Sequence, residues 1–233
     1  GLTQEPHFRN IDLTDYAGEV LGVTGLLGDG RSELFSAVFG AEPMSAGEIR
    51  LCGQAVRITS TRQAKRLGIA YVPRNRKENG IIKDMSILEN GTIVSWPDLM
   101  RRGLLNHEKQ RAEFNEEKAA LHIKMGGEND SITSLSGGNQ QKVVLAKWLS
   151  REPKVLILDN PTQGVDVGAK EEIYDIILKL AKEGVSVIVL SSEAQEIIRV
   201  CDRALVMYHG EIVGEVSGET MTEHEIMRLA TGG

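Results

Sequence analysis

The chain has 233 residues, of which 41% are hydrophobic, and a formal net charge of -6 at pH 7. This length and hydrophobic content suffice for one domain with a full core. The acidic balance argues against a nucleic-acid binder, because affinity for the phosphate backbone depends on clustered Lys and Arg.

The cysteines, the apolar runs and the first residue set further limits. Cys52 and Cys201 match no zinc or CxxC spacing, so we expect reduced thiols in a cytosolic protein. The longest apolar runs, at 155–158 and 185–190, fall far short of the ~20 residues that span a bilayer. Any contact with a membrane is therefore expected through a protein partner. Because the chain begins with Gly1 rather than Met, we expect a fragment of a longer polypeptide.

The first third of the chain predicts strands, a glycine loop and short helices. A β-branched run at 19–24 leads into a glycine-rich loop at 25–30 and a helical pattern at 31–39. Alternating segments at 47–51 and 54–58 flank Cys52-Gly53 and predict an antiparallel hairpin. A brief helix at 62–67 and a strand at 69–72, ended by Pro73, complete this part.

The middle of the chain changes character. Long helical periodicity with charged faces and no strand-like alternation runs from about Ser86 to Leu149, which predicts a helical insertion. After it, an α/β rhythm and a closing hairpin are expected, with strands at 155–158 and 185–190, helices at 169–182, 193–200 and 222–229, and hairpin strands at 204–208 and 211–216.

This order of elements predicts the α/β fold class. Strands that alternate with helices favour a mostly parallel sheet covered on both faces. We expect one domain over residues 1–233, in which 1–74 and 151–233 form the α/β core with a small antiparallel β lobe. Residues 75–150 are expected to form the helical subdomain.

The glycine loop has the composition of a phosphate site. Successive backbone N–H groups of such a loop curl around phosphate oxygens, and the following helix adds positive potential. Ser32 lies where a hydroxyl would ligate Mg²⁺, but Arg31 replaces the lysine of a strict P-loop. A planar guanidinium is not expected to thread back over the loop as an ammonium does. Weakened phosphate binding is therefore predicted, although the loop alone could be an ordinary turn between a strand and a helix.

The order of motifs resembles the nucleotide-binding domain of ABC transporters. The order is the glycine loop, the helical insert, the string Ser136-Gly137-Gly138-Asn139-Gln140, then Asp159 and Gly164-Val165-Asp166. The resemblance covers nearly the whole chain and implies a P-loop NTPase fold. Finer strings at 71–73, 76–77, 135–142, 161–170 and 190–193 are similar to the second cassette of fused two-cassette ATPases of bacterial sugar importers.

The resemblance implies an ATP site with Mg²⁺. Asp159 resembles the aspartate that holds Mg²⁺ through water, together with Ser32. The residues expected to bind the nucleotide are Gly25, Leu26, Leu27, Gly28, Asp29, Gly30, Arg31, Ser32 and Glu33.

Three further positions imply a degenerate site. Asn160 stands where active relatives carry a glutamate that polarises the attacking water, and loss of a general base typically costs about 10²–10⁴ in rate. Arg74 replaces the glutamine that would meet Mg²⁺, and Ser192 replaces the histidine that would contact the γ-phosphate. With Arg31 these departures weaken one catalytic unit, unless another residue positions the water in this family.

A second motif is intact. The resemblance implies that the signature helix of one cassette presses its N-terminus onto the γ-phosphate held by a partner cassette. The less favoured alternative is an ordinary helix cap ahead of an amphipathic helix. The residues expected to serve the partner's site are Leu135, Ser136, Gly137, Gly138, Asn139 and Gln140 of the signature and Asp166 of the D-loop.

The implied partners follow from this resemblance. We expect a second cassette, in the same full-length polypeptide, its homodimer mate, membrane permease subunits and, indirectly, a periplasmic sugar-binding protein. The expected location is peripheral, on the inner face of the cell membrane. Residues near Arg74 and at 80–90 are candidates for permease contact or for core packing, and Phe8 is a candidate for stacking on adenine. A non-transport ABC ATPase and a purely regulatory nucleotide-binding module are the alternative functions.

Overall fold

The computed structural model describes residues 1–233, which form two compact units. The core unit comprises 1–71, 154–160 and 177–233, and the helical unit comprises 72–153 and 161–176. None of the helices is both long and apolar enough to cross a bilayer. The sequence placed 161–176 in the α/β core, whereas its contacts place it with the helical unit. The prediction of one domain over the whole chain stays a prediction.

The core unit is built on a six-stranded sheet with the order β12-β11-β3-β10-β9-β6. Strand β3 pairs in parallel with β10 and β11, β9 pairs in parallel with β10, and β12 closes the sheet antiparallel to β11. Every residue of β3 and β10 is buried, as expected for strands covered on both faces. The strands are β3 (Val20–Gly25), β6 (Ile69–Val72), β9 (Val155–Asp159), β10 (Ser186–Ser191), β11 (Arg203–Tyr208) and β12 (Glu211–Ser217).

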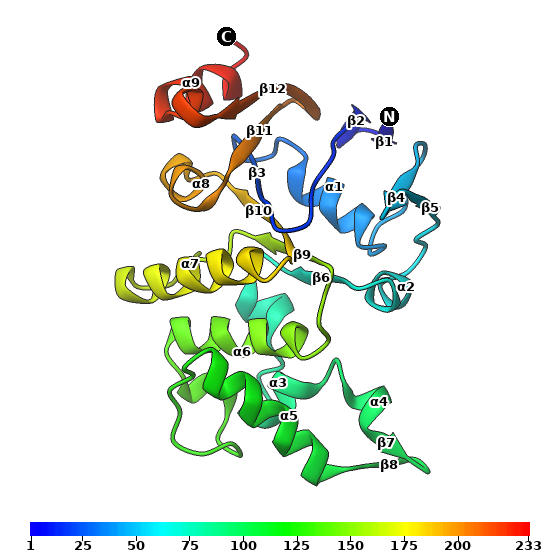
Figure 1. Cartoon of the computed structure of the whole chain (residues 1–233), viewed down its shortest axis with the longest axis vertical. Helices are drawn as coiled ribbons and strands as arrows, with labels where there is room; N and C mark the ends of the chain where they lie inside the picture. Colours follow the sequence, from blue (N-terminus) through cyan, green and yellow to red (C-terminus); the bar gives the residue numbers. More distant parts are fainter. The chain divides into compact units, whose positions relative to one another are not determined.

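Helices cover the two faces of this sheet. Helices α8 (Ala194–Val200) and α9 (Glu223–Ala230) pack against β3, and Figure 1 shows α1 (Arg31–Val38) on the other side of that strand. Gly22 in β3 permits the close approach, because a Cβ there would lie 2.9 Å from the Cβ of Ala204 and 3.0 Å from Sγ of Cys201. The α/β class with a mostly parallel sheet, predicted from the sequence, is confirmed.

Two small antiparallel sheets belong to the core unit as well. Strands β4 (Ile49–Leu51) and β5 (Gln54–Val56) form the predicted hairpin, and Cys52 and Gly53 at its turn both have positive φ, as a type I′ turn requires. Strands β1 (Leu2–Gln4) and β2 (Phe8–Ile11) were not predicted. Helix α2 (Thr61–Arg66) begins after Ser60, whose hydroxyl caps it.

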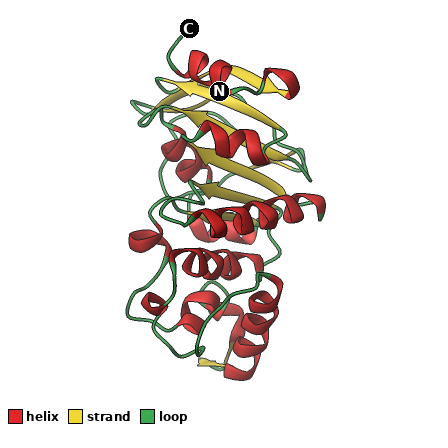
Figure 2. Ribbon diagram, turned by 90° about the vertical axis from the view of Figure 1, so that its left-hand side faces the viewer, coloured by secondary structure: helices red, strands yellow, loops and turns green.

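The helical unit carries most of the predicted insertion, and Figure 2 shows mainly helices and loops in this part. Helix α3 packs against α5 and α6. The sequence shows no strand-like alternation here, yet β7 and β8 pair as a short hairpin, and Arg102 and Gly103 at its turn both take positive φ. The elements are α3 (Ile87–Thr92), α4 (Trp96–Leu99), β7 (Met100–Arg101), β8 (Leu104–Leu105), α5 (His107–Ala120), α6 (Gly137–Leu149) and the start of α7 (Val167–Lys182).

Candidate functional site

The glycine loop between β3 and α1 depends on its glycines. Gly25, Gly28 and Gly30 have φ values of 156°, 84° and 93°. A Cβ on Gly25 would lie 2.1 Å from Oδ2 of Asp29, and one on Gly30 would lie 2.2 Å from the carbonyl oxygen of His7. The loop therefore has the backbone shape predicted for it, with no room for side chains at these two glycines.

The side chain of Arg31 lies inside this loop, contrary to the prediction that a guanidinium would not fold back over it. Its Nη1 donates to the carbonyl oxygens of Gly25 and Leu26 at 3.1 and 3.2 Å and to Oδ2 of Asp29 at 2.5 Å. The side chains of Arg31 and Asp29 are 3% and 4% exposed. The guanidinium reaches the loop interior because the Asp29 carboxylate compensates its charge there.

Ser32 and Glu33, at the start of α1, are half-buried and line a cavity of about 310 Å³. His7 and Tyr71 contribute to the same wall. Leu26 and Leu27 of the loop are exposed. Phe8 is 1% exposed, so its ring belongs to the core and has no free face for an adenine base. The suggestion that Phe8 stacks on adenine was therefore wrong.

Both carboxylate oxygens of Asp159, at the end of β9, accept hydrogen bonds from neighbouring side chains. The Asn160 amide Nδ2 donates to Oδ1 at 2.7 Å, and the Tyr71 hydroxyl donates to Oδ2 at 3.1 Å. Asn160 has φ of 46°, and its backbone N–H donates to the carbonyl of Leu190. Burial, reinforced by the Asp159 charge, raises the pKa of Tyr71 above its usual range, so its hydroxyl stays a donor. The ring of Tyr71 stacks on Phe39, with centroids 5.4 Å apart.

The residues expected to hold Mg²⁺ are of the right chemical kind. Ser32 and Asp159 offer hard oxygen donors, and Mg²⁺ bound with nucleotide keeps several waters and needs only one or two protein ligands. Each Asp159 oxygen retains one lone pair beside the hydrogen bond it accepts. The donor set fits a contact through water, and residues 1–233 contain no cluster of three or more His, Cys, Asp or Glu side chains that would bind a metal without nucleotide.

The other two degenerate positions lie in different units. Ser192, in the core unit, is exposed directly after β10. Arg74 is in the helical unit, where its Nε donates to Oε1 of Gln163 at 3.4 Å. Their predicted effects on Mg²⁺ and on the γ-phosphate stay predictions.

The signature residues form the N-terminus of α6. Ser136 is the exposed N-cap, and its Oγ accepts from the backbone N–H of Asn139 at 3.4 Å and from the Asn139 amide at 3.0 Å. Gln140 is buried, and its Nε2 donates to the carbonyl of Leu135 at 3.2 Å. Because Ser136 Oγ only accepts, its O–H remains available as a donor. It lies at the same end of the helix as the first backbone N–H groups of α6.

The two signature glycines allow α6 to approach the segment at 161–170. A Cβ on Gly137 would lie 2.8 Å from the carbonyl oxygen of Gly164, and one on Gly138 would lie 2.4 Å from the Cβ of Ala169. Asp166 is exposed and caps α7, since its Oδ1 accepts from the backbone N–H of Ala169 at 3.0 Å. The structure thus brings the predicted signature and D-loop residues together within the helical unit.

Two important residues were missed by sequence reasoning. Tyr71 contacts Asp159, as described above. Arg76 is buried, with Nε 3.3 Å from Oε1 of Gln140 and Nη1 3.5 Å from the carbonyl oxygen of Gln163. Burial lowers the pKa of Arg76. Arg76 therefore connects the signature helix to the 161–170 segment through long hydrogen bonds and positions the two elements. The only signal for it in the sequence was its place next to Lys77.

Curated proteins with similar sequences are ATP-binding proteins of sugar importers. The ribose import ATP-binding protein RbsA of Halalkalibacterium halodurans is 44% identical over 232 residues, which are 100% of this chain and 46% of that protein. The galactose/methyl galactoside import ATP-binding protein MglA of Treponema pallidum is 43% identical over 225 residues, 97% of this chain and 45% of that protein. The chain therefore spans about half the length of the curated relatives it matches.

Solved structures show the same fold. A dimeric bacterial ABC transporter cassette superposes with a TM-score of 0.76 at 24% identity, covering 91% of this chain and 90% of that one. A nucleotide-free ATP-binding cassette from an ABC transporter superposes with a TM-score of 0.82 at 19% identity, covering 97% of this chain and 92% of that one. The ABC transporter family profile matches residues 8–163. This chain belongs to the ABC transporter family, and membership implies ATP binding.

Proposed function

We propose that this chain is an ATP-binding domain of a carbohydrate importer and that its main contribution is to the ATP site of a partner cassette. The observation that supports the proposal is the contrast between the two motifs. The Ser136 hydroxyl at the N-terminus of α6 is exposed and only accepts, from Asn139, so its O–H is left to donate. The guanidinium of Arg31 and the carboxylate of Asp159 are instead buried and bonded to other groups of their own site. A motif that is open to a ligand suits a site completed by another molecule.

In this proposal, the signature contributes electrostatics rather than proton transfer. The N–H groups at the start of α6 and the Ser136 hydroxyl would donate to the γ-phosphate of ATP bound by the partner cassette. Preorganised donors of this type stabilise charge that develops in phosphoryl transfer. Arg76 acts as a positioning residue, because it connects Gln140 to the segment that ends in the exposed Asp166.

The chain's own nucleotide site would bind ATP with little or no turnover. The Asn160 side chain is an amide, which is too weakly basic to take a proton from water, and its Nδ2 donates to Asp159. Arg74 and Ser192 replace two further groups expected at an active site. Mg²⁺, held with Ser32 and through water with Asp159, would neutralise phosphate charge. The isolated chain is expected to hydrolyse ATP no faster than background.

The transported solute class is inferred from the named ribose and galactose importers. The proposed partners are a second cassette, which the lengths of those relatives accommodate, its homodimer mate and membrane permease subunits. A periplasmic sugar-binding protein would deliver the solute. The proposed location is the inner face of the cell membrane.

Paired substitutions in the full-length protein test this function. Ser136→Arg places bulk against the partner's γ-phosphate and should abolish ATPase activity and sugar uptake. Ser32→Ala removes a hydroxyl only from the chain's own site and should do far less. Asn160→Glu alone should restore no second active site, because Arg31, Arg74 and Ser192 remain. Equal damage from Ser136→Arg and Ser32→Ala would show that both sites turn over.

A purely regulatory nucleotide-binding module is the second candidate. The two hydrogen bonds to Asp159 favour it, since they suit a site that never passes through a hydrolytic cycle. Affinity purification of the full-length protein from membranes decides between them. Co-purification of permease subunits supports the importer, and their absence supports the regulatory module.

A further inference from the structure

The glycine loop is closed by its own side chains. The Asp29 carboxylate accepts from the backbone N–H of Arg31 at 3.1 Å through Oδ1 and from Nη1 of Arg31 at 2.5 Å through Oδ2. The backbone N–H of Asp29 donates to the carbonyl of Leu26 at 3.3 Å. Two backbone N–H groups and the loop's cation are thus bonded inside the loop.

These donors are the groups a phosphate would need. An anion bound by such a loop takes backbone N–H groups near the helix N-terminus and a nearby cation. Here the two oxygens of one carboxylate take an N–H at the first residue of α1 and the guanidinium. Asp29 therefore occupies the donors as an internal anion, and its side chain is only 4% exposed.

The pair is also incompletely satisfied. Nε of Arg31 is buried and has no hydrogen-bond partner, and burial raises the pKa of Asp29 although Arg31 opposes that shift. A buried cation with an unused donor gains from any second anion that reaches it. A phosphate that entered the loop would bring its charge against the carboxylate, so the carboxylate must move out or lose its charge first.

We propose that Asp29 is an autoinhibitory residue that competes with nucleotide phosphate for Arg31 and for the loop N–H groups. The proposal rests on the proposed function, since it assumes that this loop binds nucleotide. It attributes the weak phosphate binding predicted for this site to one side chain, rather than to the replacement of lysine by arginine alone. Once the carboxylate is removed, Arg31 is free to serve as the phosphate cation.

The test is ATP binding to the 233-residue chain by calorimetry, without Mg²⁺ so that the metal ligands play no part. Asp29→Asn keeps an oxygen that accepts from the Arg31 N–H but removes the charge, and Asp29→Ala removes both. Each should bind ATP at least about tenfold more tightly than the parent, since tenfold corresponds to only a fraction of the interaction within a buried ion pair. ATP should therefore raise the Tm of each variant by more than it raises the Tm of the parent.

Two controls separate the causes. Glu219→Ala removes one negative charge from an exposed position after β12 and should leave ATP affinity unchanged. The double substitution Asp29→Asn with Arg31→Ala should lose the gain, because the released cation is then absent. Unfolding curves of every variant confirm that each is folded, and Asp29→Asn carries the test if Asp29→Ala is not.

The outcomes are distinct. Measurable ATP binding that is equal or weaker in Asp29→Asn overturns the autoinhibitory role and leaves the proposed function standing. A gain that persists without Arg31 overturns it as well. No ATP binding by parent or variants overturns both, because neither the loop nor the release of its cation then serves a nucleotide.

Discussion

The start of α1, which follows a glycine loop, and the start of α6, whose first two residues are Gly137 and Gly138, are both glycine-rich helix N-termini, yet they present their donors in opposite ways. At α1, the Asp29 carboxylate and the loop carbonyls bind the cation and an N–H group. At α6, the N-cap Ser136 is exposed, and the glycines serve the packing of the helix against 161–170. An acidic side chain two residues before α1 occupies the donors there, whereas no acidic residue lies within two residues of the start of α6.

The open end depends most on Gly138, and changing it should have the largest effect on stability. Gly138→Ala would place a Cβ 2.4 Å from that of Ala169, so α6 and the start of α7 would have to move apart. We expect the free energy of unfolding to fall by about 1–3 kcal/mol, as for overpacked cores. Denaturant unfolding measures the loss, and the signature would also shift against Asp166.

Gly168→Ala is the matched control for that substitution. Gly168 lies in the first turn of α7, where a Cβ would meet only Oδ1 of Asp166 at 3.5 Å, an ordinary contact. Its unfolding midpoint should match or slightly exceed the parent's, because Ala favours helix over Gly. Equal midpoints for both variants would contradict the role of Gly138 in packing.

Tyr71→Phe tests the hydrogen bond that Tyr71 donates to Asp159 in the chain's own nucleotide site. The substitution keeps the ring on Phe39 and removes only the hydroxyl that donates to Asp159. We expect a loss of about 1–2 kcal/mol in unfolding free energy, since the acceptor is a part-buried carboxylate. Tyr16→Phe removes an exposed hydroxyl, from a residue 60% exposed, and should stay within about 0.5 kcal/mol of the parent. If both variants unfold alike, the Tyr71 hydroxyl does not hold Asp159.

The sequence predicted the long elements well, because burial and periodicity leave their mark over many residues. The buried strands β3 and β10 and the helix α7 were expected within two residues of their observed bounds. The pair β7 and β8 escaped detection, because two residues per strand show no alternation and the turn at Arg102-Gly103 depends on backbone angles.

The motifs were predicted, but the contacts that close them were not. Tyr71 and Asp159 are 88 residues apart, and nothing local connects them. Asp29 and Arg31 are two residues apart, yet the size and shape of a guanidinium argued against a side chain that threads back over the loop, because they carry no information on the acid that holds it there. Residue types identify a loop, whereas the pairing of charges inside it follows only from the fold.

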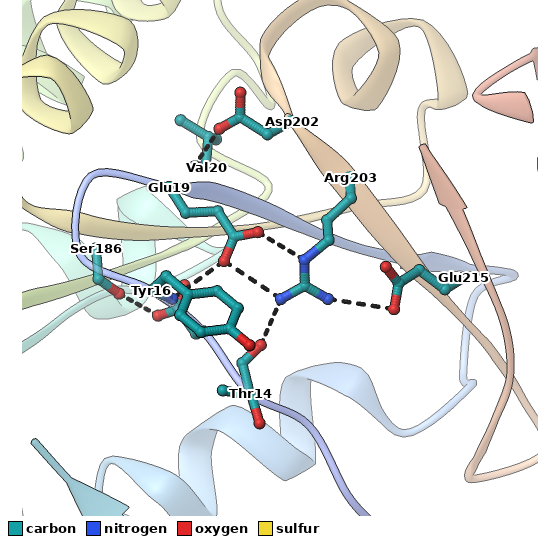
Figure 3. A network of polar contacts seen from close by, with 9 residues as sticks. Thr14, Tyr16, Glu19, Val20, Ser186, Asp202, Arg203 and Glu215 are labelled. Atoms are coloured by element: carbon teal, nitrogen blue, oxygen red, sulfur yellow. Dashed lines mark hydrogen bonds and ion pairs between the residues drawn. The ribbon is translucent and has the colours of Figure 1, made fainter. Parts of the chain in front are cut away.

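Two buried groups, one in each unit, also differ in the sign of their effect on stability as the pH rises. In the core unit, burial raises the pKa of Asp15 from 3.8 to about 6, beside Ser186 and the Arg203 network of Figure 3, in which Glu19 and Glu215 bind the guanidinium. The folded state therefore holds this proton more tightly than the unfolded state. Its contribution to stability is complete below pH 3.8 and is lost as pH rises through about 6.

Asp15→Asn should remove this part of the slope. The variant should be more stable than the parent at pH 7, and the difference should vanish toward pH 4, where the parent's carboxyl is protonated. Unfolding by urea across this range measures it. Asp12→Asn removes an exposed carboxylate nearby in sequence and should leave the slope unchanged. If both variants keep the parent's dependence of stability on pH and differ from it only by a constant amount, Asp15 is not the group that causes the slope.

In the helical unit, the corresponding group is Lys147 in α6, and its effect is expected to be the smallest within the physiological range. Burial lowers its pKa from 10.5 to about 8, while its Nζ donates to the carbonyl of Gly80 at 2.7 Å. The folded state here binds the proton less tightly than the unfolded state, so stability rises between pH 8 and 10.5. Lys147→Met should abolish that rise and lower stability at pH 10, since the Gly80 oxygen loses its donor. Lys179→Met, at a position 61% exposed, should keep the rise. If stability still rises between pH 8 and 10.5 in Lys147→Met, another group causes the rise, and Lys147 stays charged over this range.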